Sequence, residues 1–292
     1  MIARRFIAAA ALFCTTPVFA GLNPLPDAAI SDPILDAANP AGMIAFQLPT
    51  GGEKINAVIY LAAGDGPKPA LLLLHGFPGN EQNLDLAQAA RRAGWDVLTL
   101  HYRGSWGSDG AFTFVNCIED AENAARWLQS DAFIKQTGYA PSRIAVAGHS
   151  MGGMIAARAM ADVSGLAGAY LIDPWDISAE GRSLTDRNAE EAFKLSLAED
   201  LKPLDGTNAD ALLREMRANP SLLDLQKTVG AISYRPLALV YAERGLGRDF
   251  TAMVSAAGQG PVTAMLLKTD HSFSDHRIKL AAHFVRWLNE LK

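Results

Sequence analysis

One short stretch near the middle of the chain, Gly148-His149-Ser150-Met151-Gly152-Gly153, constrains the fold more than any other. An apolar run at 144–147 precedes it, and small residues with helical spacing follow it at 154–161. This order predicts a buried strand that turns sharply into a helix, with the serine at the turn. Such a turn needs neighbours without side chains, and the flanking glycines meet that need. The same pattern also occurs in ordinary glycine turns, so its place between a strand and a helix gives it weight.

The first 20 residues have the pattern of a secretory signal peptide. Two arginines stand near the start, an apolar run too short to cross a bilayer follows, and the segment ends in Val18-Phe19-Ala20, which suits a signal peptidase. We expect cleavage near Ala20 and a periplasmic or secreted protein. A lipid-anchored Cys14 is the alternative, which the bulky Phe13 directly before it disfavours.

Composition limits the partners and the means of stabilisation. The mature chain, about 270 residues, is long enough for one large domain with its own core. The chain has 26 basic and 31 acidic residues and no run of like charge, so nothing indicates binding to nucleic acid or a membrane surface. Cleavage would leave Cys117 as the single cysteine, which excludes an internal disulfide. Core packing must then stabilise the fold.

Strand and helix patterns alternate along most of the mature chain. Residues 21–43 lack periodicity and predict an irregular arm, followed by one domain over 44–292 that begins with an antiparallel strand pair at a sheet edge. Alternation with short connections implies right-handed crossovers and a parallel sheet with helices on both faces, an α/β fold. The expected strands are 43–48, 55–62, 70–74, 95–101, 143–148, 166–172, 236–242 and 262–267, and the expected helices are 84–93, 117–129, 151–162, 249–257 and 276–291.

One long segment, 174–232, interrupts this alternation. It contains helical patterns at about 186–200, 207–218 and 220–229 without a convincing strand between them. We predict a helical lid inserted above the strand ends; an unusually long ordinary crossover is the alternative.

Four motifs make the chain from about residue 44 onward resemble an α/β-hydrolase-fold serine hydrolase. The details resemble the dienelactone hydrolase and prolyl-oligopeptidase-like branches. The motifs are His75-Gly76-Phe77-Pro78-Gly79, Tyr102-Arg103-Gly104-Ser105-Trp106-Gly107, the Ser150 turn, and Asp270-His271-Ser272-Phe273. The resemblance implies the α/β-hydrolase fold, with nucleophile, acid and histidine in that order along the chain.

Ser150 is the candidate nucleophile and His271 the candidate base. A serine hydroxyl is a weak nucleophile at neutral pH and needs a base within hydrogen-bonding reach. His271 follows the last expected strand, where the resemblance requires the histidine. His276, five residues later, is the rival, and a loop histidine without a role is the plain alternative.

The carboxylate that should orient the histidine is ambiguous in the sequence. Relatives usually carry it after the strand expected at 236–242, where Glu243 is the nearest acid and our first choice. Asp249 fits a longer loop, and Asp173 or Asp176 would fit if the acid follows the preceding strand. Asp270 is interpreted as a turn residue.

The transition state needs donors for its oxyanion, and the resemblance assigns these to backbone N–H groups. Met151, at the helix start, should supply one and Phe77, in the turn after the His-Gly motif, the other. Nearby aromatic residues could line an acyl or alcohol pocket or pack as lid core: Trp106, Phe112, Phe114 and Trp175.

These features predict an enzyme that needs no cofactor and no metal, since neither a metal-ligand cluster nor a phosphate-binding loop occurs in the sequence. We expect an exported serine hydrolase that cleaves small-molecule carboxylic esters through an acyl-enzyme on Ser150. Amide bonds are an alternative, as in a serine peptidase of the prolyl-oligopeptidase-like type. Two further alternatives are an acyltransferase and a non-catalytic binding module on the same fold.

Overall fold

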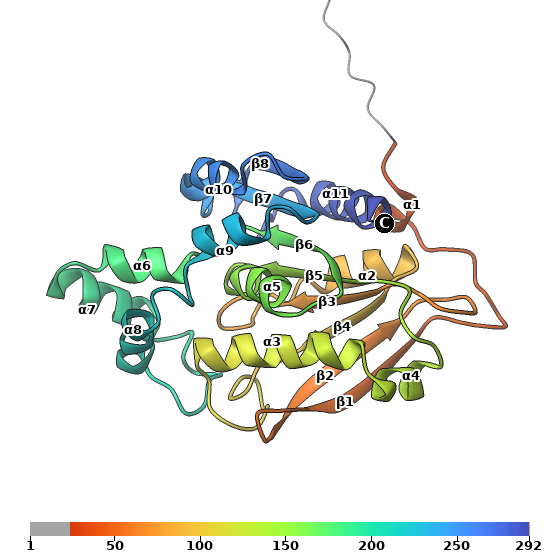
Figure 1. The fold of residues 1–292 in the computed structure, drawn as a ribbon, viewed down its shortest axis with the longest axis horizontal. Helices are drawn as coiled ribbons and strands as arrows, with labels where there is room; N and C mark the ends of the chain where they lie inside the picture. Colours follow the sequence, from red (N-terminus) through yellow and green to blue (C-terminus); the bar gives the residue numbers. More distant parts are fainter. Residues whose placement is uncertain (1–23, 292) are drawn as a thin grey trace, which may run out of the picture.

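The computed structural model describes residues 24–291 (Figure 1). The expected signal peptide at 1–20 and its cleavage position lie outside the described residues. Within the expected arm, a single helical turn, α1, precedes the first strand. The elements in chain order are α1 (Asp27–Ile30), β1 (Gly42–Thr50), β2 (Glu53–Leu61), β3 (Ala70–Leu74), α2 (Leu84–Arg92), β4 (Asp96–Leu100), α3 (Phe114–Leu128), α4 (Asp131–Thr137), β5 (Ile144–His149), α5 (Met151–Asp162), β6 (Leu166–Ile172), α6 (Ile177–Ser183), α7 (Arg187–Ser196), α8 (Ala209–Ala218), α9 (Leu225–Ile232), β7 (Leu237–Arg244), the 3-10 turn η1 (Gly247–Asp249), α10 (Phe250–Ala257), β8 (Val262–Asp270) and α11 (Arg277–Glu290).

The strands form one sheet in the order β1-β2-β4-β3-β5-β6-β7-β8. β1, β2 and β4 pair antiparallel, and all pairs from β4 to β8 are parallel. The antiparallel pair lies at one edge, and the predicted α/β fold is confirmed. Because the parallel strands run the same way, the loops after β3, β5, β6, β7 and β8 meet at one end of the sheet.

Both faces of the sheet are covered, because successive side chains of each central strand point to opposite sides. Leu72 and Val146 belong to the core that α3, α5 and α9 cover, whereas Leu71 and Ala147 belong to the core under α2 and α11. Every residue of β3, β4 and β5 is buried. The continuous apolar runs in the sequence therefore correspond to strands packed on both faces.

Four helices, α6 to α9, lie between β6 and β7, in the segment that interrupts the alternation. Figure 1 shows α6, α7 and α8 together at one end of the sheet, and α9 packs against α5. The insertion also contacts the loop after β4, where the N–H of Trp106 donates to the carbonyl of Pro203 at 3.0 Å. Its role as a lid stays a prediction.

Besides α6, which precedes the first helical pattern expected in the insertion, one helix that we did not predict, α4, follows α3 directly. Its signals are present in the sequence: Ser130 caps its first turn by accepting from the N–H of Phe133, and Gly138 ends it in a left-handed conformation.

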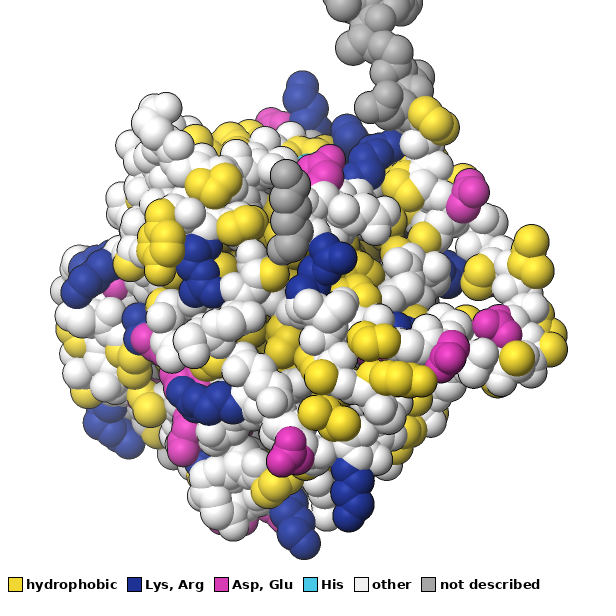
Figure 2. Space-filling model, turned by 45° about the vertical axis from the view of Figure 1, so that its right-hand side comes forward, with side chains coloured by type: hydrophobic (Ala, Val, Ile, Leu, Met, Phe, Trp, Pro, Cys, Tyr) yellow, Lys and Arg dark blue, Asp and Glu magenta, His cyan; other side chains and the backbone are white. Residues whose placement is uncertain are grey.

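The outer surface carries no segregated charge on the face drawn in Figure 2, where basic, acidic and apolar side chains are interspersed. Among residues 24–291, no helix combines the length and apolar character needed to cross a bilayer.

Candidate active site

Ser150 stands alone between β5 and α5, in a backbone conformation of φ 57° and ψ −122° that non-glycine residues rarely adopt. Two hydrogen bonds hold this turn to the end of β6. The N–H of Ser150 donates to the carbonyl of Ile172 at 2.9 Å, and its own carbonyl accepts from the N–H of Trp175 at 3.0 Å. The strand, turn and helix therefore lie where the sequence predicted them, and the surrounding structure maintains the strained serine.

Three glycines permit this turn because a side chain at any of them would collide with a neighbour. A Cβ atom on Gly148 would lie 2.0 Å from the carbonyl oxygen of Gly152, and one on Gly152 would lie 2.4 Å from that of Leu74. A Cβ atom on Gly76 would approach the Cβ of Ser150 to 2.9 Å. The His-Gly turn after β3 therefore lies directly against the serine.

Ser150 and His271 line one pocket of about 180 Å³. The segment 76–81, His149, Asp200 and Ser272 complete its wall. Ser150 is 9% exposed, and its hydroxyl has no hydrogen-bond partner among the described residues. The pocket thus presents a free hydroxyl and an imidazole to the same small space, and His276 is not among the residues that line it.

The carboxylate of Asp173 orients His271. Its Oδ2 lies 2.6 Å from Nδ1 of His271, and the Asp173 side chain is fully buried. The N–H of Ala242 donates to Oδ1 and the N–H of Leu246 to Oδ2, each at 3.0 Å. An ionised carboxylate can only accept a hydrogen bond, so Nδ1 of His271 carries the proton and donates a hydrogen bond to Asp173. Nε2 is then left as the proton acceptor of the imidazole.

Our first choice for this acid, Glu243, is corrected by the structure, which supports the alternative Asp173. β7 extends to Arg244, two residues beyond the predicted end, and Glu243 is exposed on that extension and forms no hydrogen bond or ion pair with His271. Gly245, the first residue after β7, leaves room for the Asp173 carboxylate, because a Cβ atom there would lie 2.1 Å from Oδ2 of Asp173.

The other acids considered have separate roles. Asp176 caps α6 by accepting from the N–H of Ala179 at 2.8 Å, and Asp249 belongs to η1. Asp270 accepts from the N–H of Ser274 at 2.8 Å, as expected of a turn residue. The rival base, His276, contacts the carboxylate of Asp275 at 2.9 Å at the start of α11.

His149 supports His271 through its backbone carbonyl and its ring, a role that the sequence did not indicate. Its Nε2–H donates to the backbone carbonyl of His271 at 2.8 Å, and the two ring centroids are 4.5 Å apart. Burial, together with the neighbouring His271, lowers the pKa of His149 to about 4. His149 is therefore neutral at physiological pH. The sequence shows it only as the variable residue of the turn motif, so no local signal could reveal this contact.

The two backbone donors expected for an oxyanion lie next to Ser150, Met151 as the following residue of the chain and Phe77 in the pocket wall. Met151 is the first residue of α5, and the N–H of a first helical residue has no partner within its helix. Phe77 lines the pocket, and its N–H makes no hydrogen bond within the described chain.

The aromatic side chains that we considered as pocket lining pack elsewhere. The Phe77 ring contacts three of them, with centroid distances of 5.6 Å to Phe112, 6.4 Å to Phe114 and 6.5 Å to Trp175. Trp106 donates its Nε1–H to the carbonyl of Pro78 at 2.8 Å. They support the loop that carries Phe77, and none of the four lines the pocket with Ser150.

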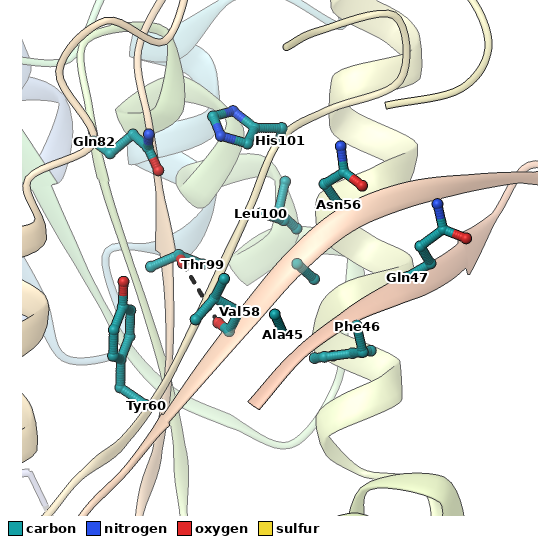
Figure 3. Close-up of a pocket in the computed structure, with 11 residues that line it drawn as sticks. Ala45, Phe46, Gln47, Asn56, Val58, Tyr60, Gln82, Thr99, Leu100 and His101 are labelled. Carbon is teal, nitrogen blue, oxygen red and sulfur yellow. Dashed lines mark hydrogen bonds between the residues drawn. The ribbon is translucent and has the colours of Figure 1, made fainter. Parts of the chain in front are cut away.

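A larger hollow of about 420 Å³ lies on the face of the antiparallel edge of the sheet (Figure 3). Side chains from three strands surround it, among them Gln47, Asn56, Tyr60 and Thr99, with Gln82 from the loop before α2. It contains neither Ser150 nor His271. We therefore take the smaller pocket, which Ser150 and His271 both line, as the candidate active site. Over residues 24–291, no group of histidine, cysteine and acidic side chains is arranged to hold a metal ion.

Comparison with known families decides the classification, because the profile of the Alpha/beta hydrolase family matches residues 71–290. This chain belongs to the α/β-hydrolase family. The match spans β3 to α11 and so includes the serine turn, Asp173 and His271.

Individual relatives are distant. A 92-residue stretch is 32% identical to the Escherichia coli (strain K12) protein named "Putative esterase YheT", and it covers 30% of this chain and 25% of that protein. The hydrolase chain thus matches only about a quarter of that relative's length.

Solved structures share the fold at low identity. The Pyrococcus furiosus esterase Pf2001 has a TM-score of 0.63 and 16% identity, with 86% of this chain and 91% of that chain covered. Est1E from Butyrivibrio proteoclasticus, with ferulic acid bound, has a TM-score of 0.66 and 18% identity, with 85% of this chain and 99% of that chain covered. The Pyrococcus horikoshii acylaminoacyl peptidase has a TM-score of 0.61 and 14% identity over 86% of this chain and 42% of the peptidase.

Proposed function

We propose that this α/β hydrolase is an exported serine esterase that cleaves small carboxylic esters through an acyl-enzyme on Ser150. The observation that carries the proposal is the pairing of buried Asp173 with Nδ1 of His271 at 2.6 Å, because His271 lines the same pocket as the free Ser150 hydroxyl. Export rests on the signal-peptide pattern of residues 1–20.

The geometry supports the following sequence of steps. Nε2 of His271 takes the hydroxyl proton as Ser150 Oγ attacks the ester carbonyl, and the buried carboxylate of Asp173 stabilises the imidazolium that forms. The backbone N–H groups of Met151 and Phe77 donate to the oxyanion. His271 then gives the proton to the departing alcohol, and water repeats the cycle to release the acid.

Esters are favoured over amides by the similarity to esterases, since the partial relative is named a putative esterase and two of the solved structures that share the fold are esterases. The pocket of about 180 Å³ corresponds to about six water volumes, which suits a short acyl or alcohol group.

A fluorophosphonate probe tests the nucleophile directly. We expect the mature wild-type protein to be labelled, and Ser150→Ala and His271→Ala to lose labelling while keeping wild-type circular dichroism spectra. Ser196→Ala, an exposed serine on α7, is the matched control and should label fully. Turnover of p-nitrophenyl esters from acetate to octanoate should fall with chain length. Folded wild-type protein that neither labels nor turns over any ester would overturn the proposal.

A further inference from the structure

The pocket that holds Ser150 and His271 carries acidic side chains and no basic one other than the histidines themselves. Among the described residues that line it, Glu81 and Asp200 bear the formal charges. The two come from segments far apart in the chain, Glu81 from the loop before α2 and Asp200 from the insertion after α7. A substrate at Ser150 would therefore meet two carboxylates in the pocket wall.

Asp200 has no counter-ion of its own. Within residues 24–291 it forms no ion pair and no side-chain hydrogen bond, and burial together with the neighbouring Glu199 raises its pKa. Glu199 points outward, with its side chain 82% exposed, and pairs with Lys202. The one local lysine, Lys202, is thus engaged on the outer surface, and Asp200 in the pocket wall lacks a cation among the described residues.

A backbone hydrogen bond holds the Glu81 carboxylate. Its Oε1 accepts from the N–H of Asn83 at 2.6 Å, which orients the carboxylate at the start of α2. Arg277 lines an adjacent hollow that shares Glu81 and Ser272 with this pocket, and its guanidinium is bound by Asp85 and Asn83. The arginine is therefore already neutralised by another carboxylate.

The pocket itself is built for a ligand, because the unpartnered Ser150 hydroxyl, in a side chain more than nine-tenths buried, faces into it. In a space of about six water volumes, a charged group of a small substrate lies only a few bonds from the attacked carbonyl. The carboxylates and the reacting carbonyl would therefore be close together.

We propose that this pocket selects short esters that carry a positively charged nitrogen within a few bonds of the scissile carbonyl. The inference rests on the proposed esterase function and names its substrate class. In a half-exposed site, two carboxylates should raise kcat/KM for a cation over an uncharged isostere by about 5- to 20-fold. Salt should weaken this preference, because exposed charges are screened.

Isosteric ester pairs test the preference without any mutation. Acetylcholine is compared with 3,3-dimethylbutyl acetate, and L-alanine methyl ester with methyl isobutyrate, by pH-stat titration at pH 6.5 and low and high salt. We expect the cationic member of at least one pair to be preferred at least 5-fold at low salt. Asp200→Asn and Glu81→Gln should each reduce that preference, whereas Glu199→Gln, which removes the same charge outside the pocket, should leave it unchanged.

The outcomes separate this inference from the proposed function. If p-nitrophenyl acetate is turned over but neither pair shows a preference, or if Glu199→Gln changes the preference as much as Asp200→Asn does, the charge selection is wrong and the esterase stands. If p-nitrophenyl acetate is not turned over at all, the proposed function falls and the substrate class falls with it.

Discussion

Asp173 bonds to His271 across an intervening strand. The acid follows β6 and the histidine follows β8, and β7 lies between these strands in the sheet. The end of β7 makes this possible, because the N–H groups of Ala242 and Leu246 donate to the carboxylate and Gly245 leaves space for it. The end of β7 is thus the support for the acid, although it does not supply the acid itself.

Replacing Asp173 by Asn should abolish most of the activity. An amide at this position stabilises the wrong histidine tautomer and cannot balance the imidazolium, a change that lowers kcat by about 10³- to 10⁴-fold in enzymes with this arrangement. Glu243→Gln, an exposed acid on β7, should stay within about twofold of wild type, since surface changes of this kind are near neutral. Ester turnover on folded variants decides between them, and a larger loss in the Glu243 variant would restore it as the acid.

Gly245→Ala should impair catalysis more than folding. The added Cβ would lie 2.1 Å from Oδ2 of Asp173 and 3.0 Å from Cα of His271, so both groups must shift. A displacement of about 1 Å can cost about 100-fold in rate, and we expect a loss of kcat of that order. Gly230→Ala, on α9, meets nothing closer than 3.4 Å and should retain full activity with slightly higher thermal stability. Equal activity of the two variants would contradict this prediction.

Two buried histidines should make the free energy of unfolding depend on pH. Burial lowers the pKa of both His75 and His149 to about 4, while the unfolded chain titrates near 6.5. Between these two pKa values the unfolded state binds more protons than the folded state. The contribution of the neutral histidines to the free energy of unfolding is therefore fully present above pH 6.5 and is lost as the pH falls toward 4.

Urea unfolding at pH 7 and pH 5 measures the effect. Each histidine should account for about 2 kcal/mol of the decrease between these two pH values. His149→Gln should reduce the pH dependence by its share, whatever its stability at pH 7. An unchanged dependence would show that His149 titrates normally in the folded protein.

Asp120 should be among the most costly acids to remove. It is fully buried on α3 and accepts from Nε of Arg103 at 2.6 Å, from the N–H of Arg103 at 2.8 Å and from the hydroxyl of Thr50 at 2.8 Å. Asp120→Ala would leave the buried guanidinium of Arg103 without its inner partner, which costs about 3–5 kcal/mol.

The matched control for Asp120 lies on the same helix. Glu122 pairs with Arg126 at 2.8 Å, and the arginine side chain is 51% exposed. Glu122→Gln should cost no more than about 0.5 kcal/mol, because exposed pairs one helical turn apart contribute little. Chemical denaturation compares the two variants, and similar losses in both would show that the buried pair contributes no more than a surface pair.

The sequence alone determined those parts of the fold and site that depend on neighbours along the chain. Alternating apolar runs and amphipathic segments predicted the parallel sheet and its helical layers, since each pattern reports local burial. Glycines on either side of Ser150 predicted the turn, because its sterics involve only a few adjacent residues. The position of His271 followed from the order of the motifs.

Tertiary structure decided which distant groups meet. Asp173 is 98 residues from His271 in the chain, and His149, which donates to the carbonyl of His271, is 122 residues from it. Strand order and the exact end of β7 therefore set both contacts. The sequence placed the acid on Glu243 because it could not show that β7 runs two residues further, past a register shift after Ala242. Likewise, Asp200 belongs to the insertion after α7 and lines the serine pocket only in the folded chain. Hydrogen-bond partners are chosen by distances of a few ångströms in space, and no local pattern along a chain contains that information.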